Sequence, residues 1–173
     1  MHPKLKSMLS TVGQIVPLSE NTKLNLMIKS FSALKLPLLL FTNATVLELT
    51  DEKCVVGIGL GYRTQNHLGV MYFGALAIGA ELSIAAKAVQ EISRSGKKID
   101  FIFKDFEMKF LKRADGDVHF ITDQAHLVKE LIFEASNSEE RLEKTMLGYA
   151  IVPSKGTEKI AEYKLTLSVK QRR

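Results

Sequence analysis

"QNHLGVMYFGALAIGAELSIAAKA", residues 65–88, is the stretch that decides the fold. It is apolar and rich in small residues for more than twenty positions, yet one carboxylate, Glu81, stands inside it. About twenty apolar residues would be enough to span a bilayer. However, Glu81 and Lys87 interrupt the run, and amphipathic strands follow it directly. The pattern therefore favours a fully buried core helix over residues 70–92 and no membrane span.

The small residues of this helix indicate what packs against it. Glycines inside a helix cost about 1 kcal/mol each relative to alanine, and the close approach of a neighbouring element would offset that cost. We expect a sheet to approach the helix backbone closely and to bend around it. The small residues concerned are Gly74, Ala75, Ala77, Gly79, Ala80, Ala85, Ala86 and Ala88.

Hydrophobic periodicity predicts the elements around the central helix. An amphipathic helix is expected over 19–35, with Ser19 as its N-cap and Pro37 ending it. Polar turns separate the predicted strands, and Asp-Gly within 114–117 is typical of a hairpin. The other expected elements are strands at 38–49, 53–61, 99–110, 118–122, 141–153 and 158–170, and a helix at 124–140.

Within the strand expected at 99–110, the apolar positions change parity. Ile99, Phe101 and Phe103 are odd-numbered, whereas Phe106 and Phe110 are even-numbered. A shift of one residue inside a strand predicts a β-bulge, and bulges bend strands. We therefore expect an α+β fold, with a curved antiparallel sheet and its most apolar helix on one face. One domain, 1–173, is expected, with an N-terminal segment and helix at 1–35 and the sheet domain at 36–173.

The composition excludes a disordered or collagen-like chain. The 173 residues are 46% hydrophobic and 25% charged with a net charge of +5, which suits a globular chain. The cations are spread along the chain rather than massed, so nucleic acid is not expected as a partner, although the bias would suit a phosphate-bearing ligand. Cys54 is the single cysteine, which favours a buried thiol and a reducing, cytoplasmic location. No histidine spacing suits a metal site, and no cofactor is expected.

The sequence allows two interpretations of Glu81. A carboxylate in an apolar environment is costly, and its pKa should rise unless it is paired. In the first reading, Glu81 pairs with a lysine or accepts a backbone hydrogen bond; in the second, it is a catalytic carboxylate. The residues before the helix also allow two interpretations. Asn66 and His67 could cap the helix, or free amides at the helix N-terminus could polarise a carbonyl oxygen.

The length of the helix constrains a catalytic site. From Gly74 to Glu81 the helix rises about 10 Å, because each residue adds about 1.5 Å. A carbonyl at the helix N-terminus is therefore out of comfortable reach of Glu81 in the same chain. Two copies of the helix lying antiparallel about a twofold axis would bring the two groups together. We therefore expect a composite site in a homodimer.

These residues resemble a known motif. The stretch is similar to that of the hotdog-fold acyl-CoA thioesterases of the phenylacetyl-CoA thioesterase type, whose motif reads N-x-H-G-x-x-H-G-G, five variable or apolar residues, an alanine and an acid. Without a gap, Asn66 takes the asparagine position, Gly69 the first glycine, Gly74 the last glycine, Ala80 the alanine and Glu81 the acid. The chain looks closer still to a branch known mainly as a domain of unknown function.

The resemblance implies a hotdog fold from about residue 36 onward, together with roles for individual residues. Glu81 would be the general base or nucleophile, the amides of Phe73 and Gly74 would hold the carbonyl oxygen, and Asn66 would orient the carbonyl or the water. The substrate, an acyl-CoA or acyl-carrier thioester, would bind between the subunits of a dimer or a dimer of dimers. Substrate contacts are expected from His67, Gly69, Met71 and Tyr72, and the acyl pocket from Met71, Phe73, Leu76 and the strand at 99–110.

The chain departs from the motif at three positions. Tyr72 replaces the histidine before the glycine pair, Phe73 replaces the first glycine of the pair, and a histidine stands directly after Asn66 instead of two residues after it. Phe73 would narrow the acyl pocket or alter the donor geometry. Thioester hydrolysis is the leading hypothesis. A non-catalytic acyl-CoA or acyl-carrier binder with a regulatory role, and a structural dimer with an empty cleft, remain as alternatives.

Overall fold

The computed structural model describes residues 20–172. This part of the chain forms four α-helices, one of them short, and six strands. In chain order the elements are α2 (Glu20–Lys35), α3 (Pro37–Thr42), β1 (Thr45–Leu49), β2 (Cys54–Ile58), α4 (Phe73–Ser95), β3 (Ile99–Phe110), β4 (Val118–Thr122), α5 (Ala125–Ser136), β5 (Leu142–Ile151), a 3₁₀ turn (Pro153–Lys155) and β6 (Lys159–Gln171).

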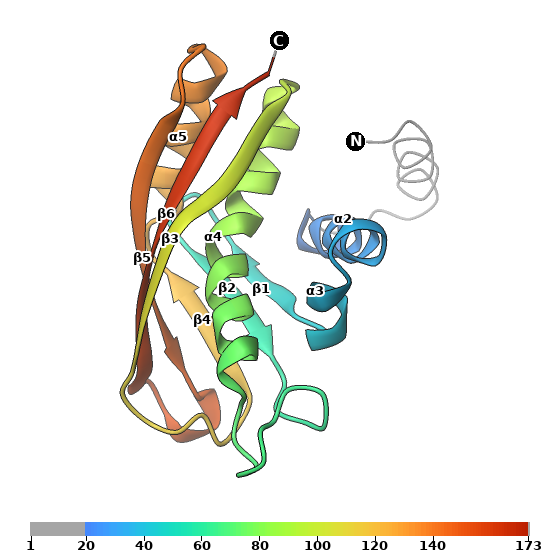
Figure 1. The fold of residues 1–173 in the computed structure, drawn as a ribbon, viewed down its shortest axis with the longest axis vertical. Coiled ribbons are helices and arrows are strands. Elements are labelled where there is room, and N and C mark those ends of the chain that lie inside the picture. Colours follow the sequence, from blue (N-terminus) through green and yellow to red (C-terminus); the bar gives the residue numbers. More distant parts are fainter. Residues whose placement is uncertain (1–19, 173) are drawn as a thin grey trace.

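The six strands form one antiparallel sheet in the order β1-β2-β4-β5-β6-β3. α4 runs along one face of this curved sheet, and α5 lies beside its C-terminal half (Figure 1). α2 and α3 lie at the β1 end of the sheet, while β3 forms the opposite edge (Figure 1). This is the α+β arrangement that the sequence predicts.

α4 packs tightly on the sheet through its small residues. An added Cβ at Gly79 would lie 2.2 Å from the Phe120 ring of β4, so only glycine fits there without movement. Deeper along the same face, the Ser83 hydroxyl and the Tyr163 hydroxyl are 2.8 Å apart and both side chains are buried. By length and composition α4 could cross a membrane, but 61% of its apolar window is buried, as in the core helix of a globular fold.

Two detailed sequence predictions are confirmed. The register of β3 against β6 shifts between Phe103 and Asp105, which places the predicted bulge at Lys104. As a result, the apolar side chains of β3 before and after the bulge lie on the same face of the sheet. Their cross-strand neighbours on that face are the buried residues of β6. The predicted apolar stripe of α5 is buried throughout: Ala125, Val128, Leu131, Ile132 and Ala135.

The first predicted strand is wrong over residues 38–42, which form α3. Pro37 takes the first helical position, where its fixed φ favours a helix, and Asn43 ends the helix in the left-handed conformation with φ 51°. The strand begins only at Thr45. Other boundaries differ by a few residues, and the predicted N-cap Ser19 lies outside the described residues.

The predicted hairpin at 114–117 is also wrong. β3 pairs only with β6, and β4 pairs with β2 and β5, so this Asp-Gly segment connects strands that are not neighbours. The last two predicted strands are confirmed as β5 and β6, which pair as a hairpin. Thr166 and Ser168 of β6 are buried although they are polar, and side chains of β5 hydrogen-bond to both.

Cys54 lies in the core with no exposed surface, which agrees with a structural thiol. Burial raises its thiol pKa to about 12, so the nucleophilic thiolate is scarcely populated at neutral pH.

The contact between Gly79 and Phe120 predicts an unusual effect of alanine. Gly79→Ala should gain about 1 kcal/mol of helix propensity, but overpacking against the ring should cost about 1–3 kcal/mol. We expect net destabilisation in denaturant unfolding and partial rescue by Phe120→Leu. Gly61→Ala, at a site with no neighbour within 4 Å, is the matched control. A more stable Gly79→Ala variant would contradict the packing described.

Candidate active site

The N-terminus of α4 presents free backbone donors. The helix begins at Phe73, its N-cap is Tyr72, and no side chain caps it. Ala75 and Leu76 both donate to the Tyr72 carbonyl, at 2.9 and 3.1 Å. Within residues 20–172 the amides of Phe73 and Gly74 have no hydrogen-bond acceptor. The two N–H groups carry the partial positive charge of a helix start and are available to an anionic oxygen.

Asn66 holds the loop before the helix in shape. Its Oδ1 accepts hydrogen bonds from the amides of Leu68 (2.8 Å) and Val70 (3.4 Å), and Gly69 takes a φ of +72° in the same turn. The interpretation that Asn66 and His67 cap the helix is therefore wrong. The Nδ2 group of Asn66 has no acceptor among the described residues and is available to donate to a ligand.

The loop is fastened to the rest of the molecule by backbone hydrogen bonds. Tyr72 donates to Thr64 (2.7 Å) and Met71 donates to Ala114 (2.8 Å). Thr64 is itself buried, with its hydroxyl bonded to the Gly59 carbonyl at 2.7 Å. These long-range contacts fix the start of α4, and no local sequence signal points to them. Met71, expected to touch substrate, is almost fully buried in the core.

Glu81 lies on the face of α4 that points away from the sheet. The residues before it on this face, Gly74, Ala77 and Ile78, are half-buried like Glu81, whereas the sheet-facing positions are buried. No cation and no hydrogen-bond donor among the described residues pairs with its carboxylate. Burial raises the pKa of Glu81 above its ordinary value of 4.5. The interpretation that Glu81 pairs with a lysine or accepts a hydrogen bond from a backbone amide therefore finds no support.

Two aromatic rings flank the free amides. Tyr72 and Phe73 are both substantially exposed, and their ring centroids lie 4.8 Å apart at an interplanar angle of 55°. The Tyr72 ring covers Gly74 so closely that an added Cβ there would lie 2.7 Å from it. The residues that depart from the motif thus surround the donors without taking their hydrogen bonds. His67 and Gly69 are exposed on the same loop.

The central helix carries a second ionisable residue, Lys87, and this one is fully paired. Its Nζ lies 2.9 Å from both the Asp51 and the Glu91 carboxylates, and its side chain is 1% exposed. Hydrogen bonds from Lys129 and Lys87 hold the pKa of Asp51 down to about 2. This cluster ties the β1–β2 turn to α4 and α5. It accounts for Lys87 structurally and leaves Glu81 as the unpaired charge of the helix.

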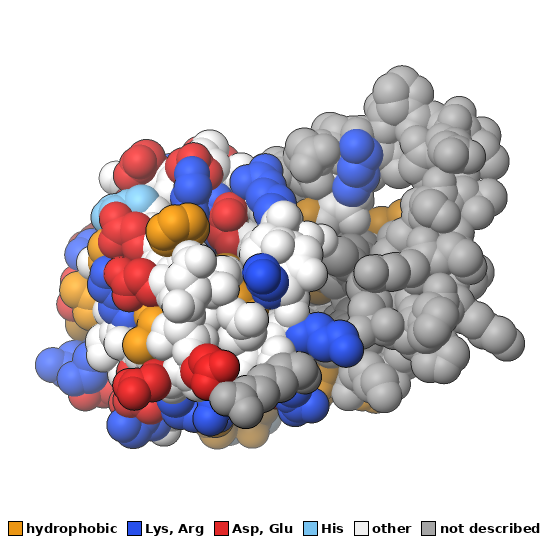
Figure 2. Space-filling model, turned by 90° about the horizontal axis from the view of Figure 1, so that it is seen from above, with side chains coloured by type: hydrophobic (Ala, Val, Ile, Leu, Met, Phe, Trp, Pro, Cys, Tyr) orange, Lys and Arg blue, Asp and Glu red, His pale blue; other side chains and the backbone are white. Residues whose placement is uncertain are grey.

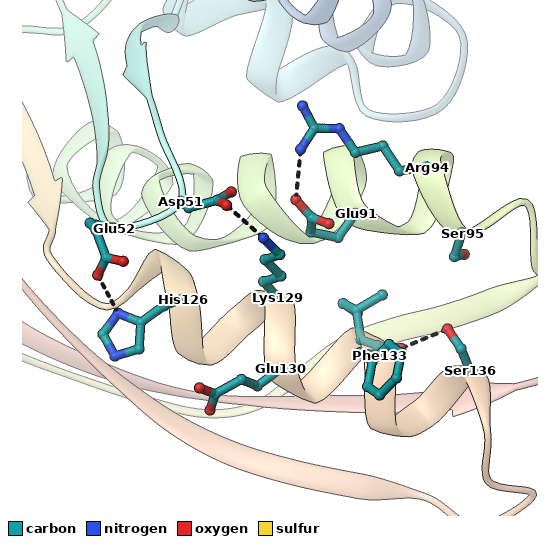
Figure 3. A pocket seen from close by; sticks show the side chains of 11 residues that line it. Asp51, Glu52, Glu91, Arg94, Ser95, His126, Lys129, Glu130, Phe133 and Ser136 are labelled. Atoms are coloured by element: carbon teal, nitrogen blue, oxygen red, sulfur yellow. Dashed lines mark hydrogen bonds and ion pairs between the residues drawn. The ribbon is translucent and has the colours of Figure 1, made fainter.

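A hollow of about 530 Å³ adjoins this cluster (Figure 3). Its charged side chains largely face one another: Lys129 points to Asp51, Arg94 to Glu91 and His126 to Glu52 (Figure 3). Seen from above, this end of the molecule shows acidic and basic side chains intermixed (Figure 2). None of the predicted site residues lines the hollow, whose walls are Asp51, Glu52, Glu91, Arg94, Ser95, His126, Lys129, Glu130, Ile132, Phe133 and Ser136.

The described part of the chain, residues 20–172, contains no group of three or more His, Cys, Asp or Glu side chains placed to hold a metal ion.

Comparison with solved structures finds the same architecture at low sequence identity. A Shewanella oneidensis protein proposed to be a thioesterase matches with a TM-score of 0.72 at 11% identity, over 86% of this chain and 99% of its own. A Chlorobaculum tepidum protein of unknown function matches at 0.73 and 9%, over 88% and 97%. A thioesterase from Haemophilus influenzae matches at 0.62 and 14%, over 89% and 92%. These likenesses establish the fold.

The curved antiparallel sheet around a long central helix is therefore the hotdog fold, as the sequence motif implies. The chain belongs to the family described as domain of unknown function DUF4442, whose model matches residues 25–169. A search of curated proteins finds no match.

The burial of Glu81 predicts that replacing this residue raises the stability of the fold in a pH-dependent way. Because burial raises its pKa in the folded state, Glu81 is neutral and costs no stability below pH about 4.5, and its ionisation destabilises the fold as the pH rises through the folded-state pKa. Glu81→Gln should therefore unfold at a higher temperature than the wild type at pH 8, and the difference should vanish near pH 4. Thermal unfolding across this range measures the effect.

The matched control is Glu134→Gln, the same change at an exposed position of α5. Equal melting temperatures for Glu81→Gln and the wild type at pH 8 would contradict an unpaired, partly desolvated carboxylate at Glu81.

Proposed function

We propose that this protein hydrolyses acyl thioesters of CoA or of an acyl carrier. The observation that carries the proposal is the pairing, on one helix, of free N-terminal amides at Phe73 and Gly74 with an unpaired, partly buried Glu81. The first group suits an oxygen that becomes negative. The second suits proton transfer, because a raised pKa brings a carboxylate closer to the working pH. The thioesterase names of the fold's neighbours add support at the level of the fold.

The reaction follows from these two groups. Glu81 takes a proton from water as the water oxygen attacks the thioester carbonyl carbon, and the amide N–H groups stabilise the tetrahedral oxyanion. When the carbonyl re-forms, the C–S bond breaks and the thiolate leaves, taking the proton from Glu81. Water is thus divided between the carboxylic acid and the thiol. Direct attack by Glu81 to form an anhydride, which water then cleaves, would use the same groups.

A homodimer would bring the two groups together. Along the helix, Gly74 and Glu81 are about 10 Å apart, too far to act on one carbonyl. The two edges of the sheet differ in a way that supports one pairing mode. At β1, the Asn25 side chain of α2 both donates to and accepts from the Val46 backbone, at 2.8 Å each, so these two groups are not available to another strand.

The β3 edge has no such cover in the described residues. It is twelve residues long, and Phe106 and Phe110 on the face that carries α4 are 44% and 53% exposed. A long apolar edge strand is a template for pairing with another chain. Pairing of β3 with β3 of a second copy, about a twofold axis, is the mode we propose. It would let the N-terminus of one α4 approach Glu81 of the other.

A second candidate function, acyl-thioester binding without hydrolysis, is favoured by one observation. The bulky rings of Tyr72 and Phe73 stand beside the amides where the motif has a histidine and a glycine. If they hold the carbonyl away from the amides, the protein would bind the thioester and leave it intact. A regulatory or structural role would then follow.

A panel of short, aromatic and long acyl-CoA thioesters separates these functions. Glu81→Gln should lower kcat about 100-fold or more with binding retained, because it removes the base. Phe73→Pro should lower kcat to a similar extent, because it deletes one donor N–H. Proline is favoured at the first helical position, and Tyr72 already has the extended conformation (φ −66°, ψ 140°) that proline requires of its predecessor.

Phe73→Ala is the matched control, because it removes the ring and keeps the N–H. It should retain far more activity than Phe73→Pro. A wild type that binds the panel and hydrolyses none of it would overturn the hydrolase proposal in favour of the binding protein.

A further inference from the structure

The short helix α3 exposes large apolar side chains on the flank of the molecule. Leu36 and Leu38 are 45% and 65% exposed, and Leu40 and Phe41 are 41% and 52% exposed. Thr42 is buried, and Leu39 is half-buried, so the helix is anchored and its outer side is fixed in place. We name Leu36, Leu38, Leu40 and Phe41 the α3 patch. Protein surfaces rarely expose four such side chains on one short segment without a partner.

Along the sequence, the net positive charge falls in the N-terminal segment that includes α2 and α3. The whole chain has 24 Lys and Arg against 19 Asp and Glu. Residues 1–42 hold five lysines and one glutamate, which leaves 19 cations against 18 anions for residues 43–173. The net positive charge of the protein therefore lies almost entirely in the part that contains α2 and α3. Lys29 on α2 is among the exposed cations.

A cationic and an aromatic side chain lie between the α3 patch and the loop before α4. The Arg63 guanidinium lies 5.9 Å from the centre of the Phe41 ring, and the adjacent Tyr62 is 93% exposed. Tyrosine and arginine are the side chains that suit the boundary between water and lipid, because each has an apolar body and a polar end. The patch thus has an apolar centre with a cationic and aromatic rim.

The position of the patch leaves it free in the proposed dimer. α2 and α3 lie at the β1 end of the sheet, and β3 is the opposite edge (Figure 1). A partner copy paired through β3 would therefore not cover α3. At the β1 edge, Asn25 occupies the outward backbone N–H and C=O groups of Val46, which disfavours strand pairing there.

We propose that the α3 patch binds the surface of an anionic lipid bilayer. Leucine and phenylalanine side chains would enter the acyl boundary, and the exposed Lys29 and Arg63 would stay at the headgroups, as in interfacial helices. The excess of cations over anions favours a lipid surface over a second copy of this chain, because two such regions would repel one another. The inference does not depend on thioester hydrolysis. It would place the protein where amphipathic acyl compounds accumulate.

The test is co-sedimentation of the full chain with vesicles. Vesicles of equal parts phosphatidylglycerol and phosphatidylcholine should bind the wild type, and vesicles of phosphatidylcholine alone should bind it far less. The double variant Leu38→Glu with Phe41→Glu should bind the anionic vesicles about tenfold or more weakly. Lys29→Gln should weaken binding about fivefold, and added salt should reduce the binding of the wild type.

The matched control is Phe133→Glu, the same kind of change at a side chain 71% exposed on α5. It should bind like the wild type. Binding of the wild type that is equal for both vesicle types, or a double variant that binds as well as Phe133→Glu, would overturn the proposal. A double variant with a smaller particle size in sedimentation velocity would assign the patch to contact between copies instead and would also overturn it. Unchanged circular dichroism shows that the variants are folded.

Discussion

The close contact between Gly79 of α4 and the Phe120 ring of β4 is the constraint on which the site depends. It holds the central helix low on the sheet, at a separation that no larger residue allows. Glu81 follows two residues later, a little over half a turn around the helix, so it must point away from the sheet. The same packing that builds the core therefore presents an acid on the open side of α4, partly buried and without a partner.

Charge pairing on α4 is strongly asymmetric. Lys87 is buried deeply and is matched by two carboxylates, Asp51 and Glu91. Glu81 has no counter-charge in the described residues, and its pKa is raised by burial. A fold that pairs one buried charge so completely could have paired the other. An unpaired acid on the same helix as free N-terminal amides is a cost to stability that a function would justify.

Much of the fold could be predicted from local patterns. The spacing of apolar residues along the sequence indicates α4, the bulge near Lys104 and the buried stripe of α5. The failures have physical causes. The apolar run at 38–42 is too short for periodicity to distinguish strand from helix, and Pro37 and Asn43 decide for helix. The Asp-Gly segment suggested a hairpin, yet strand pairing is set by long-range packing that local turn signals do not encode. For the candidate site, the motif singled out Asn66, Gly74 and Glu81, but it did not reveal that the side-chain Oδ1 of Asn66 shapes the loop.

In the composite site that we propose, the amides come from one subunit and the acid from the other. The most direct measurement mixes two inactive chains, Glu81→Gln and Phe73→Pro, by co-expression with different tags, and assays the purified heterodimer. Activity should return to about half that of the wild-type dimer, because one of the two sites in the purified heterodimer has both Glu81 and the Phe73 amide intact. A heterodimer that forms and stays as inactive as its two parents would contradict the shared site.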